Sequence, residues 1–361
     1  MLFDLTDRRS IDDDERDAAA SLVLITTSRR HGHDAVACSA PTAQYAMQCV
    51  NPCELVPVVT NNTMEYHKFL EIISLAPELL SGADDGPFRV AHLCEAPGSF
   101  IDALVDRVSF VDWHAISLKR AGSIQFYSRH IAASRVNGRQ RVHGGGDDTG
   151  DLLRPTNCDR FCRDVGLASI SLVTADGDGH ELGLGSEQNE VVHVRLAAAE
   201  TGVALQLLAD RGSFVLRLFD TVHPDTVSLV ASLCTLFRRV IVTQPRASPT
   251  GSAERYLLCL HVKRDHPMYA SVTHQMHAYA FDGESMPNVV VPAYVYHNLN
   301  LSVIAINEAI EARILKAKTL AVFLDAVGLR TPEAIAIHRA EQLKQSPAKL
   351  RDAHEFVASV S

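Results

Sequence analysis

Residues Arg89–Phe100, RVAHLCEAPGSF, carry the clearest signal of the fold of this chain. The run RVAHLC predicts a buried strand, and Pro97-Gly98 then makes a tight turn before a helix that starts at once. Gly98 lets the backbone come close to a ligand, and Ser99 is a candidate cap for the helix. Backbone N–H groups at such a turn suit a carboxylate or a phosphate. The segment is neither GxGxxG nor a Walker loop, so by itself it also fits a plain strand-to-helix turn.

Short apolar runs alternate with helical runs on the carboxyl side of this turn. Strands that alternate with helices predict an α/β fold, in which a mostly parallel sheet is covered by helices on both faces. Open sheets of this kind bind ligands at the carboxyl ends of their strands. After the strand at 89–94, we expect strands over 111–118, 170–176, 213–219, 240–243 and 255–262, and helices over 99–107, 191–210 and 225–237.

The same pattern divides the chain into three regions. Residues 1–55 have mixed charge and irregular patterning, and we interpret them as an N-terminal extension of uncertain order. Residues 56–265 hold the α/β domain, in which a helix over Met64–Leu80 precedes the first strand. Residues 266–361 are expected to form a mainly helical C-terminal extension, with helices from Ser302 to about Val327, from Pro332 and from Pro347.

Composition excludes several classes of protein. Hydrophobic residues make up 47% and charged residues 21% of the 361 residues, which is typical of a globular chain and not of a disordered one. No run of about 18 apolar residues is free of charge, so we expect no membrane-spanning helix. Met1–Ser10 also lacks the pattern of a secretory signal. The net charge of −9 argues against a nonspecific nucleic-acid coat but leaves room for a local basic groove.

The eight cysteines are scattered, which indicates a reducing compartment rather than a disulfide framework. Two cysteine pairs have loose ligand spacing and no tight C-x2-C pair occurs, so we expect no bound metal. The residues concerned are Cys49 and Cys53, with His31 and His33 as candidate further ligands, and Cys158 and Cys162.

The segment LCEAPGSF resembles the D-x-C-A-A-P-G-G-F motif of the FtsJ-type RNA ribose 2′-O-methyltransferases. The resemblance implies a Rossmann-like methyltransferase sheet that binds S-adenosylmethionine, with this turn holding the methionine part of the cofactor. Two positions depart from the motif, because His92 stands where the family has an acid and Ser99 replaces the second glycine. The cofactor-binding residues implied in this turn are Cys94, Glu95, Ala96, Pro97, Gly98, Ser99 and Phe100.

The family's Lys-Asp-Lys-Glu tetrad has four counterparts here, in the same order. Lys68 lies in the helix before the first strand, and Asp176, followed by Gly177, ends the strand ISLVTAD. SFVLRLFD and SAERY match the family's F-V-x-K-x-F-D and N-S-E-R-Y, which gives Arg217 and Glu254. The resemblance therefore implies these four residues as the catalytic group, with Asp176 also beside the cofactor.

The chemistry of ribose methylation explains these residue types. A ribose hydroxyl is a poor nucleophile that must lose its proton as it attacks the methyl group of a sulfonium, so a lysine base and nearby cations favour the reaction. Two carboxylates orient and tune those cations. Arg217 departs from the family's lysine, since arginine stays protonated and cannot be the base, although it can stabilise an alkoxide. Either Lys68 takes on more of the proton chemistry, or catalysis is slow, or the protein is inactive.

Further segments resemble the eukaryotic cap-specific mRNA 2′-O-methyltransferases of this family. GGGDDTGDLLRPTN, residues 144–157, resembles G-D-G-D-I-T-R-P-E-N, which implies that Asp151, or Asp148 in second place, lies near the adenosine of the cofactor. Ile116–Lys119 resembles G-x-T-L-K, and Gln188-Asn189 resembles Q-E-N near the cap pocket. Expected RNA contacts are Lys119, Asn189 and Arg246, with Arg120, Arg135, Arg139 and Arg141 as further basic candidates.

The resemblance implies transfer of a methyl group from S-adenosylmethionine to the 2′-OH of the first transcribed nucleotide of capped mRNA, converting cap 0 to cap 1. It implies capped RNA and the capping or transcription machinery as partners, without a membrane. The expected compartment is the nucleus, or the cytoplasm for a viral protein. One alternative is methylation of ribosomal or transfer RNA, which the C-terminal extension and the 144–157 match disfavour. The other is a weakened or inactive subunit that binds cofactor or RNA, which Arg217, His92 and Ser99 keep open.

Overall fold

A computed structural model describes residues 1–8, 40–51, 53, 62–84, 86–119, 141–177, 186–219, 221–287 and 290–345. The chain divides into two compact units. The first comprises Met1–Thr26, Leu75–Thr243 and Glu254–Ser302. The second comprises Thr27–Ser74, Gln244–Ala253 and Val303–Ser361. The predicted division of the chain at residues 55 and 265 stays a prediction.

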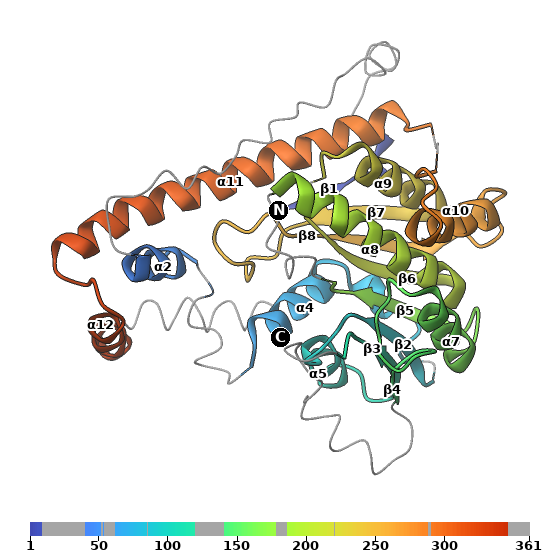
Figure 1. The fold of residues 1–361 in the computed structure, drawn as a ribbon, viewed down its shortest axis with the longest axis horizontal. Coiled ribbons are helices and arrows are strands. Elements are labelled where there is room, and N and C mark those ends of the chain that lie inside the picture. Colours follow the sequence, from blue (N-terminus) through green and yellow to red (C-terminus); the bar gives the residue numbers. More distant parts are fainter. Residues whose placement is uncertain are drawn as a thin grey trace. The chain divides into compact units, whose positions relative to one another are not determined.

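The first unit is built on one eight-stranded sheet, with strand order β1-β7-β8-β6-β5-β2-β3-β4 (Figure 1). Strands β4, β3, β2, β5 and β6 run parallel, as the strand–helix alternation predicts. β8 lies antiparallel between β6 and β7, and β1 adds an antiparallel edge to β7. The strands are β1 Leu2–Asp4, β2 Phe88–Leu93, β3 Val111–Ile116, β4 Arg141–His143, β5 Ile170–Ala175, β6 Leu208–Leu218, β7 Phe237–Thr243 and β8 Arg255–Val262.

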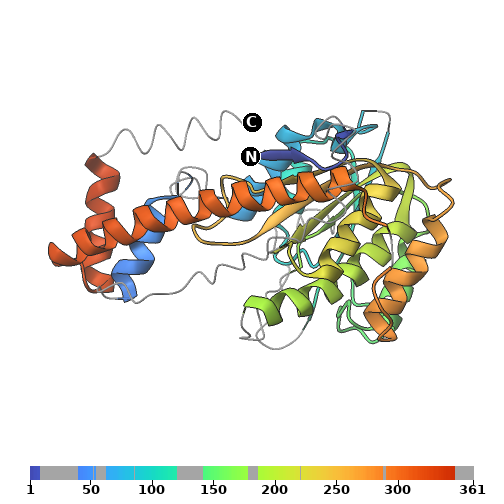
Figure 2. The ribbon, with the colours of Figure 1, turned by 90° about the horizontal axis from the view of Figure 1, so that it is seen from above.

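Helices cover both faces of this sheet. On one face α8 packs against β5 and β6, α9 packs against β7 and β8, and α7 and α10 pack on α8 (Figures 1 and 2). α5 lies on the other face, where its Phe100 ring approaches Tyr256 of β8. The next residue of β8, Leu257, belongs to the core on the α8 side, and neighbouring residues of a strand point to opposite faces of the sheet. The helices are α5 Ser99–Val105, α7 Pro155–Val165, α8 Ser186–Leu207, α9 Pro224–Leu236 and α10 Tyr269–Phe281.

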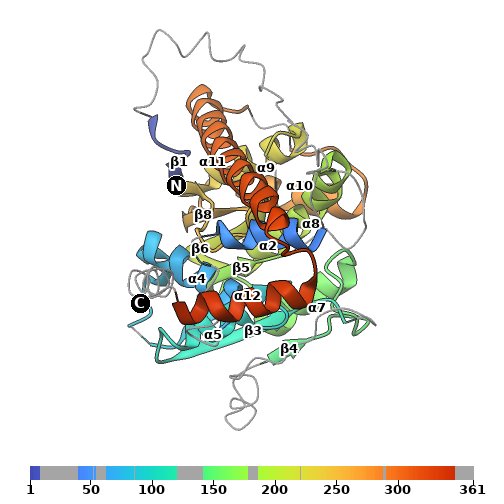
Figure 3. The ribbon, with the colours of Figure 1, turned by 90° about the vertical axis from the view of Figure 1, so that its left-hand side faces the viewer.

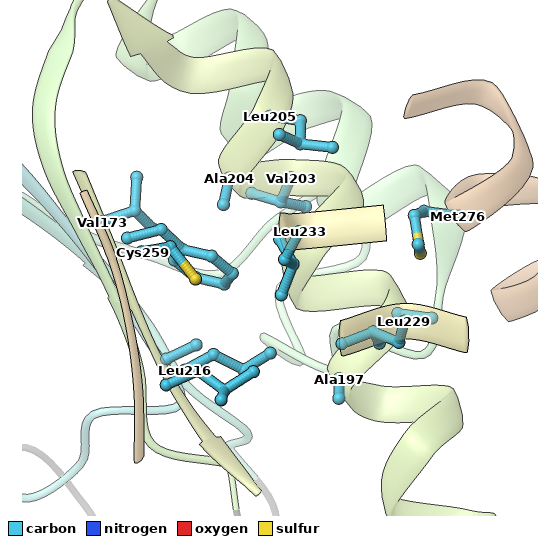
Figure 4. Close-up of a cluster of buried hydrophobic side chains, with 14 of the residues drawn as sticks. Val173, Ala197, Val203, Ala204, Leu205, Leu216, Leu229, Leu233, Cys259 and Met276 are labelled. Atoms are coloured by element: carbon cyan, nitrogen blue, oxygen red, sulfur yellow. The ribbon is translucent and has the colours of Figure 1, made fainter. Parts of the chain in front are cut away.

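The main hydrophobic core of the first unit lies between the sheet and α8 and α9. Val173, Leu216 and Cys259 come from three neighbouring strands and face Ala204 of α8 and Leu233 of α9 (Figure 4). All five side chains are buried, and a buried leucine contributes roughly 1.5–3 kcal/mol to stability. This packed layer holds the strands in place, so that their carboxyl ends form a fixed edge.

The second unit is helical in its described part. Tyr45 and Ala46 of α2 (Ala40–Cys49) pack against Ala317, Ala321 and Leu324 of α11 (Ala293–Ala326). α12 (Pro332–Gln345) also contacts α2, as Figure 3 shows. The unit also holds most of α4 (Met64–Leu75), and α11 contributes residues to both units. No helix in the described ranges has an apolar run of the length that a bilayer requires.

Several element boundaries differ from the expected ones. The helix expected over 191–210 begins at Ser186 and ends at Leu207, because Leu208 already pairs with Ile170 at the start of β6. The helix expected from Ser302 begins at Ala293, just after Pro292. The helix expected over Met64–Leu80 ends at Leu75, and a 3-10 turn (η3, Pro77–Leu80) follows Pro77. α10 was not expected as a separate helix, and the helix expected from Pro347 lies outside the described residues.

Candidate active site

Three members of the expected tetrad lie together at one edge of the first unit's sheet. Asp176 follows β5 directly, and Arg217 lies one residue before the end of β6. Glu254 directly precedes β8, which runs antiparallel to β6, so that Tyr256 pairs with Arg217. The start of β8 therefore meets the carboxyl ends of β5 and β6, where open α/β sheets bind ligands.

Arg217 joins the two carboxylates of this cluster. Its Nη2 lies 3.0 Å from Glu254 Oε2, and its Nη1 lies 3.7 Å from Asp176 Oδ1. The guanidinium also lies over the ring of Phe219, 4.8 Å from the ring centre. The Glu254 side chain is 1% exposed, whereas those of Arg217 and Asp176 are 13% and 12% exposed. The cluster is thus nearly desolvated, which strengthens its ion pairs, and only Asp176 and Arg217 reach the surface.

Tyr256 is a further residue of this cluster, which lies within the SAERY motif but was not predicted as a site residue. Its hydroxyl donates a hydrogen bond to Asp176 Oδ1 over 2.8 Å. Burial and the nearby carboxylates of Asp176 and Glu254 raise the pKa of this phenol well above its ordinary value. Tyr256 therefore stays a neutral donor and fixes the orientation of Asp176. Tyr256 follows Glu254 by two residues, and alternate residues of an extended segment point to the same side. This spacing was the signal in the sequence that Tyr256 lies near the other site residues.

Lys68, the fourth expected member, belongs to the second unit. It lies in α4, its side chain is 3% exposed, and its Nζ lies 3.7 Å from Glu65 Oε1. Its role beside the other three residues stays a prediction.

The turn after β2 has the backbone conformation that the sequence predicts, but a different helix cap. Gly98 has φ 108° and Cys94 has φ 56°, so the chain reverses sharply between β2 and α5. The expectation that Ser99 caps the helix is wrong, because Ser99 is already the first helical residue and Gly98 is the N-cap. Glu95 caps the helix instead, because its Oε1 accepts a hydrogen bond from the Phe100 amide over 2.6 Å.

His92, which replaces the family's acid, is a buried neutral group. Its Nδ1 lies 2.8 Å from Thr174 Oγ1 on the neighbouring strand β5. Complete burial lowers the pKa of this imidazole to about 3, since a charged ring would be desolvated there. The position therefore cross-links β2 and β5 and carries no charge at neutral pH.

The loop after β4, which is expected to lie near adenosine, is held by its own side chains. Asn157 of α7 is buried, donates to Thr149 Oγ1 and accepts from the Asp147 amide. Asp151 Oδ1 accepts the amide of Leu153. Asp148 has φ 64°, is exposed, and forms an ion pair with Lys119 over 2.8 Å. The structure thus joins one expected cofactor residue, Asp148, with one expected RNA contact, Lys119.

The other expected RNA contacts are spread over the chain. Arg246 belongs to the second unit, where its Nε lies 3.1 Å from Glu71 Oε1 and its amide donates to Glu71 Oε2. Asn189 and Arg141 lie in α8 and β4, but their side chains are outside the description. Arg120, Arg135 and Arg139 lie outside the described residues altogether, as do His31 and His33.

No metal centre is found within the described ranges, because no three His, Cys, Asp or Glu side chains gather there as ligands. The seven cysteines that the structure describes are free thiols, including Cys49, Cys53, Cys158 and Cys162. Burial raises the pKa of the Cys53 and Cys162 thiols to about 12. These two groups are therefore inert thiols at neutral pH.

Comparison with known proteins identifies the family. Residues 65–262, more than half of the chain, match the model of the FtsJ-like methyltransferases. The cap-specific mRNA (nucleoside-2′-O-)-methyltransferase 2 of Danio rerio is 33% identical over 214 residues, covering 55% of this chain and 28% of that protein. The protein of the same name from Drosophila melanogaster is 32% identical, covering 49% and 27%. The cap-specific mRNA (nucleoside-2′-O-)-methyltransferase 1 of Leishmania braziliensis is 32% identical, covering 48% and 44%.

These matches span less than half the length of each of the three relatives. The family match includes all four expected tetrad positions, together with the turn after β2 and the loop after β4. The chain belongs to the FtsJ-like methyltransferase family.

Proposed function

We propose that this protein transfers a methyl group from S-adenosylmethionine to the ribose 2′-OH of the first transcribed nucleotide of capped mRNA. The observation that carries the proposal is the Asp176–Arg217–Glu254 cluster at the carboxyl ends of the strands, in a chain whose family is the FtsJ-like methyltransferases. The relatives named as cap-specific mRNA 2′-O-methyltransferases supply the substrate class.

The groups around the strand ends fit S-adenosylmethionine. The backbone of Cys94–Phe100 turns sharply between β2 and α5, with Gly98 in a conformation that favours glycine, which suits close approach of an amino acid moiety. The carboxylates of Asp148 and Asp151 follow β4, and such oxygens accept from an adenine amine or a ribose hydroxyl. When bound, the cofactor supplies an electrophilic methyl group on a sulfonium.

The protein's own residues would act on the ribose hydroxyl. The charge of Arg217 favours the alkoxide that develops as the hydroxyl loses its proton, and Lys68 is the amine proposed to accept that proton. Asp176 and Glu254 orient the guanidinium, and the Tyr256 hydroxyl holds Asp176. The methyl transfer is in line, so positioning of the hydroxyl by these groups would supply a large share of the rate.

Capped RNA is the proposed substrate, and the capping or transcription machinery the proposed partner, in the nucleus or, for a viral protein, in the cytoplasm. Lys119, Asn189 and Arg246 are the proposed RNA contacts. Of these, Lys119 and Arg246 would contact phosphates, which position the RNA and carry no sequence information, whereas Asn189 would lie toward the cap pocket. The cap itself would then define which nucleotide is methylated.

The second candidate function is a weakened or inactive subunit that binds cofactor or RNA. It is favoured by Arg217, because a guanidinium paired with two carboxylates cannot accept a proton. Methylation of ribosomal or transfer RNA is the remaining alternative within the family.

The test is methyl transfer from labelled S-adenosylmethionine to matched short RNAs, capped and uncapped, with nuclease mapping of the product. Glu254→Gln is the matched variant, since it keeps the side-chain shape and removes the charge that holds Arg217. Label at the 2′-oxygen of the first nucleotide, on capped RNA alone and lost in Glu254→Gln, supports the proposal. Label on both RNAs or at internal sites favours a ribosomal or transfer RNA enzyme. Cofactor binding without transfer favours the inactive subunit.

A further inference from the structure

A further carboxyl group lies buried against the turn that carries Asp176. Glu200 belongs to α8, is 0% exposed, and faces the turn that follows β5. A Cβ atom added to Gly177 would lie 2.6 Å from Glu200 Oε1, so the carboxyl is in contact with this turn. Cys94, at the end of β2, is the other neighbour of the carboxyl. Glu200 therefore supports the ends of the two strands that carry the expected cofactor turn and the catalytic aspartate.

Burial, together with the charge of Asp176, disfavours the ionisation of Glu200. Arg217 is the nearby cation, but its guanidinium is engaged by Asp176 and Glu254. Neither oxygen of Glu200 has an aligned hydrogen bond among the described residues. The Cys94 thiol and the Gly177 amide lie close and lower the pKa of the carboxyl in part, as does Arg217, but burial outweighs them. Burial, followed by the charge of Asp176, raises the pKa of Glu200 from 4.5 to about 8.

The other titratable groups of this region behave differently. The thiol of Cys94 has its pKa raised well above 9, by burial and by Glu200, and the Tyr256 phenol has its pKa raised well above 10. Cys158 of α7, which faces Cys94, is a buried thiol whose pKa is also raised. Among these neighbours and Glu200, ionisation near pH 8 belongs to Glu200.

We infer that Glu200 is a positioning residue of the methyl-transfer site, and that its neutral carboxylic acid form holds the Asp176–Gly177 turn against Cys94. Ionisation places a second negative charge behind Asp176 without a cation of its own. The carboxylate then draws water or Arg217 toward itself, and Asp176 loses its alignment with Arg217 and Tyr256. This inference rests on the proposed function, since it assigns an alkaline limit to the activity of that same site.

The experiment compares the wild type with Glu200→Gln, which has the shape of the neutral acid and cannot ionise. The control is Glu284→Gln, because Glu284 is exposed and lies outside the site. Single-turnover methyl transfer to capped RNA is measured from pH 6 to 10, together with the infrared carbonyl band of protonated carboxylic acids. The infrared band reports the proton on Glu200 even if no RNA is methylated.

In the wild type and in Glu284→Gln, we expect the rate to fall at least fivefold between pH 7 and pH 9.5, and the infrared band to disappear over the same range. In Glu200→Gln, we expect the rates at pH 7 and pH 9.5 to differ by less than twofold. The infrared band that titrates in the wild type should be missing from this variant. An alkaline fall that persists in Glu200→Gln overturns the inference, as does an infrared band that the substitution does not remove. Absence of transfer at every pH, with the band present and titrating, contradicts the proposed function instead and leaves the protonation of Glu200 standing.

Discussion

Replacing Arg217 by lysine separates the two properties of the site, its stability and its proton chemistry. The guanidinium contacts Glu254 at 3.0 Å and Asp176 at 3.7 Å, and it stacks on Phe219. One ammonium group keeps the charge but not this fork, so Arg217→Lys loses one charge-assisted contact of about 1.5–3 kcal/mol and a stacking contact of roughly 0.5–1 kcal/mol. We therefore expect a loss of stability of about 2–4 kcal/mol, which lowers the Tm by roughly 4–8 °C.

The rate is expected to change in the opposite direction. A well-placed general base contributes about 10²–10⁴-fold, and lysine can take that role where arginine cannot. Because Lys68 is already proposed to accept the proton, we expect a smaller gain, on the order of tenfold in single-turnover rate at pH 8. Calorimetric unfolding and methyl transfer to capped RNA measure the two effects on the same preparation. A less stable variant whose rate falls, with cofactor binding unchanged, would refute the reasoning that Arg217 limits proton transfer.

Three further predictions follow from the contacts around the site. Tyr256→Phe removes the donor to Asp176, so we expect the rate of methyl transfer to fall roughly tenfold or more at unchanged cofactor affinity; a change below twofold would show that Asp176 is held by other groups. Gly177→Ala places a methyl group against the Glu200 carboxyl, so we expect it to lower the urea midpoint and the affinity for S-adenosylhomocysteine together, and an unaltered midpoint would contradict the packing. Glu200→Gln is expected to stabilise the protein more at pH 9 than at pH 5. The pKa of Glu200 is raised in the folded state, so the wild type loses stability progressively between pH 4.5 and about 8, by at most about 5 kcal/mol. Urea denaturation measures the free energy of unfolding of both proteins at both pH values, and a difference between them that is the same at pH 5 and pH 9 would contradict this.

Much of the fold follows from local patterns in the sequence. The strand–turn–helix at Arg89–Phe100 and the strand at 255–262 were expected at nearly their observed bounds, because a short apolar run and a Pro-Gly turn act over neighbouring residues. The boundary between α8 and β6 was not expected where it lies. Leu208 leaves the helix because it pairs with Ile170, a partner distant in sequence. Helix ends of this kind depend on tertiary pairing rather than on propensity.

The sequence indicated residue types for the candidate site, and the structure shows which of these residues are in contact. Resemblance to the family's motifs gave Asp176, Arg217 and Glu254, and the structure brings these three within ion-pair distance. The cap by Glu95 was missed, because Ser99 fits the rule for caps while the backbone enters the helix one residue earlier.

Residue type and spacing were enough to indicate the alternation of strands and helices, the family, and the positions from which catalytic side chains could come. Three features became visible in the folded chain alone: Arg217 is shared between two carboxylates, Tyr256 holds Asp176, and Glu200 lies buried against Gly177. The reason is physical: burial and distance set the pKa of a group and the strength of its ion pairs, and both arise only when strands far apart in the chain are packed side by side.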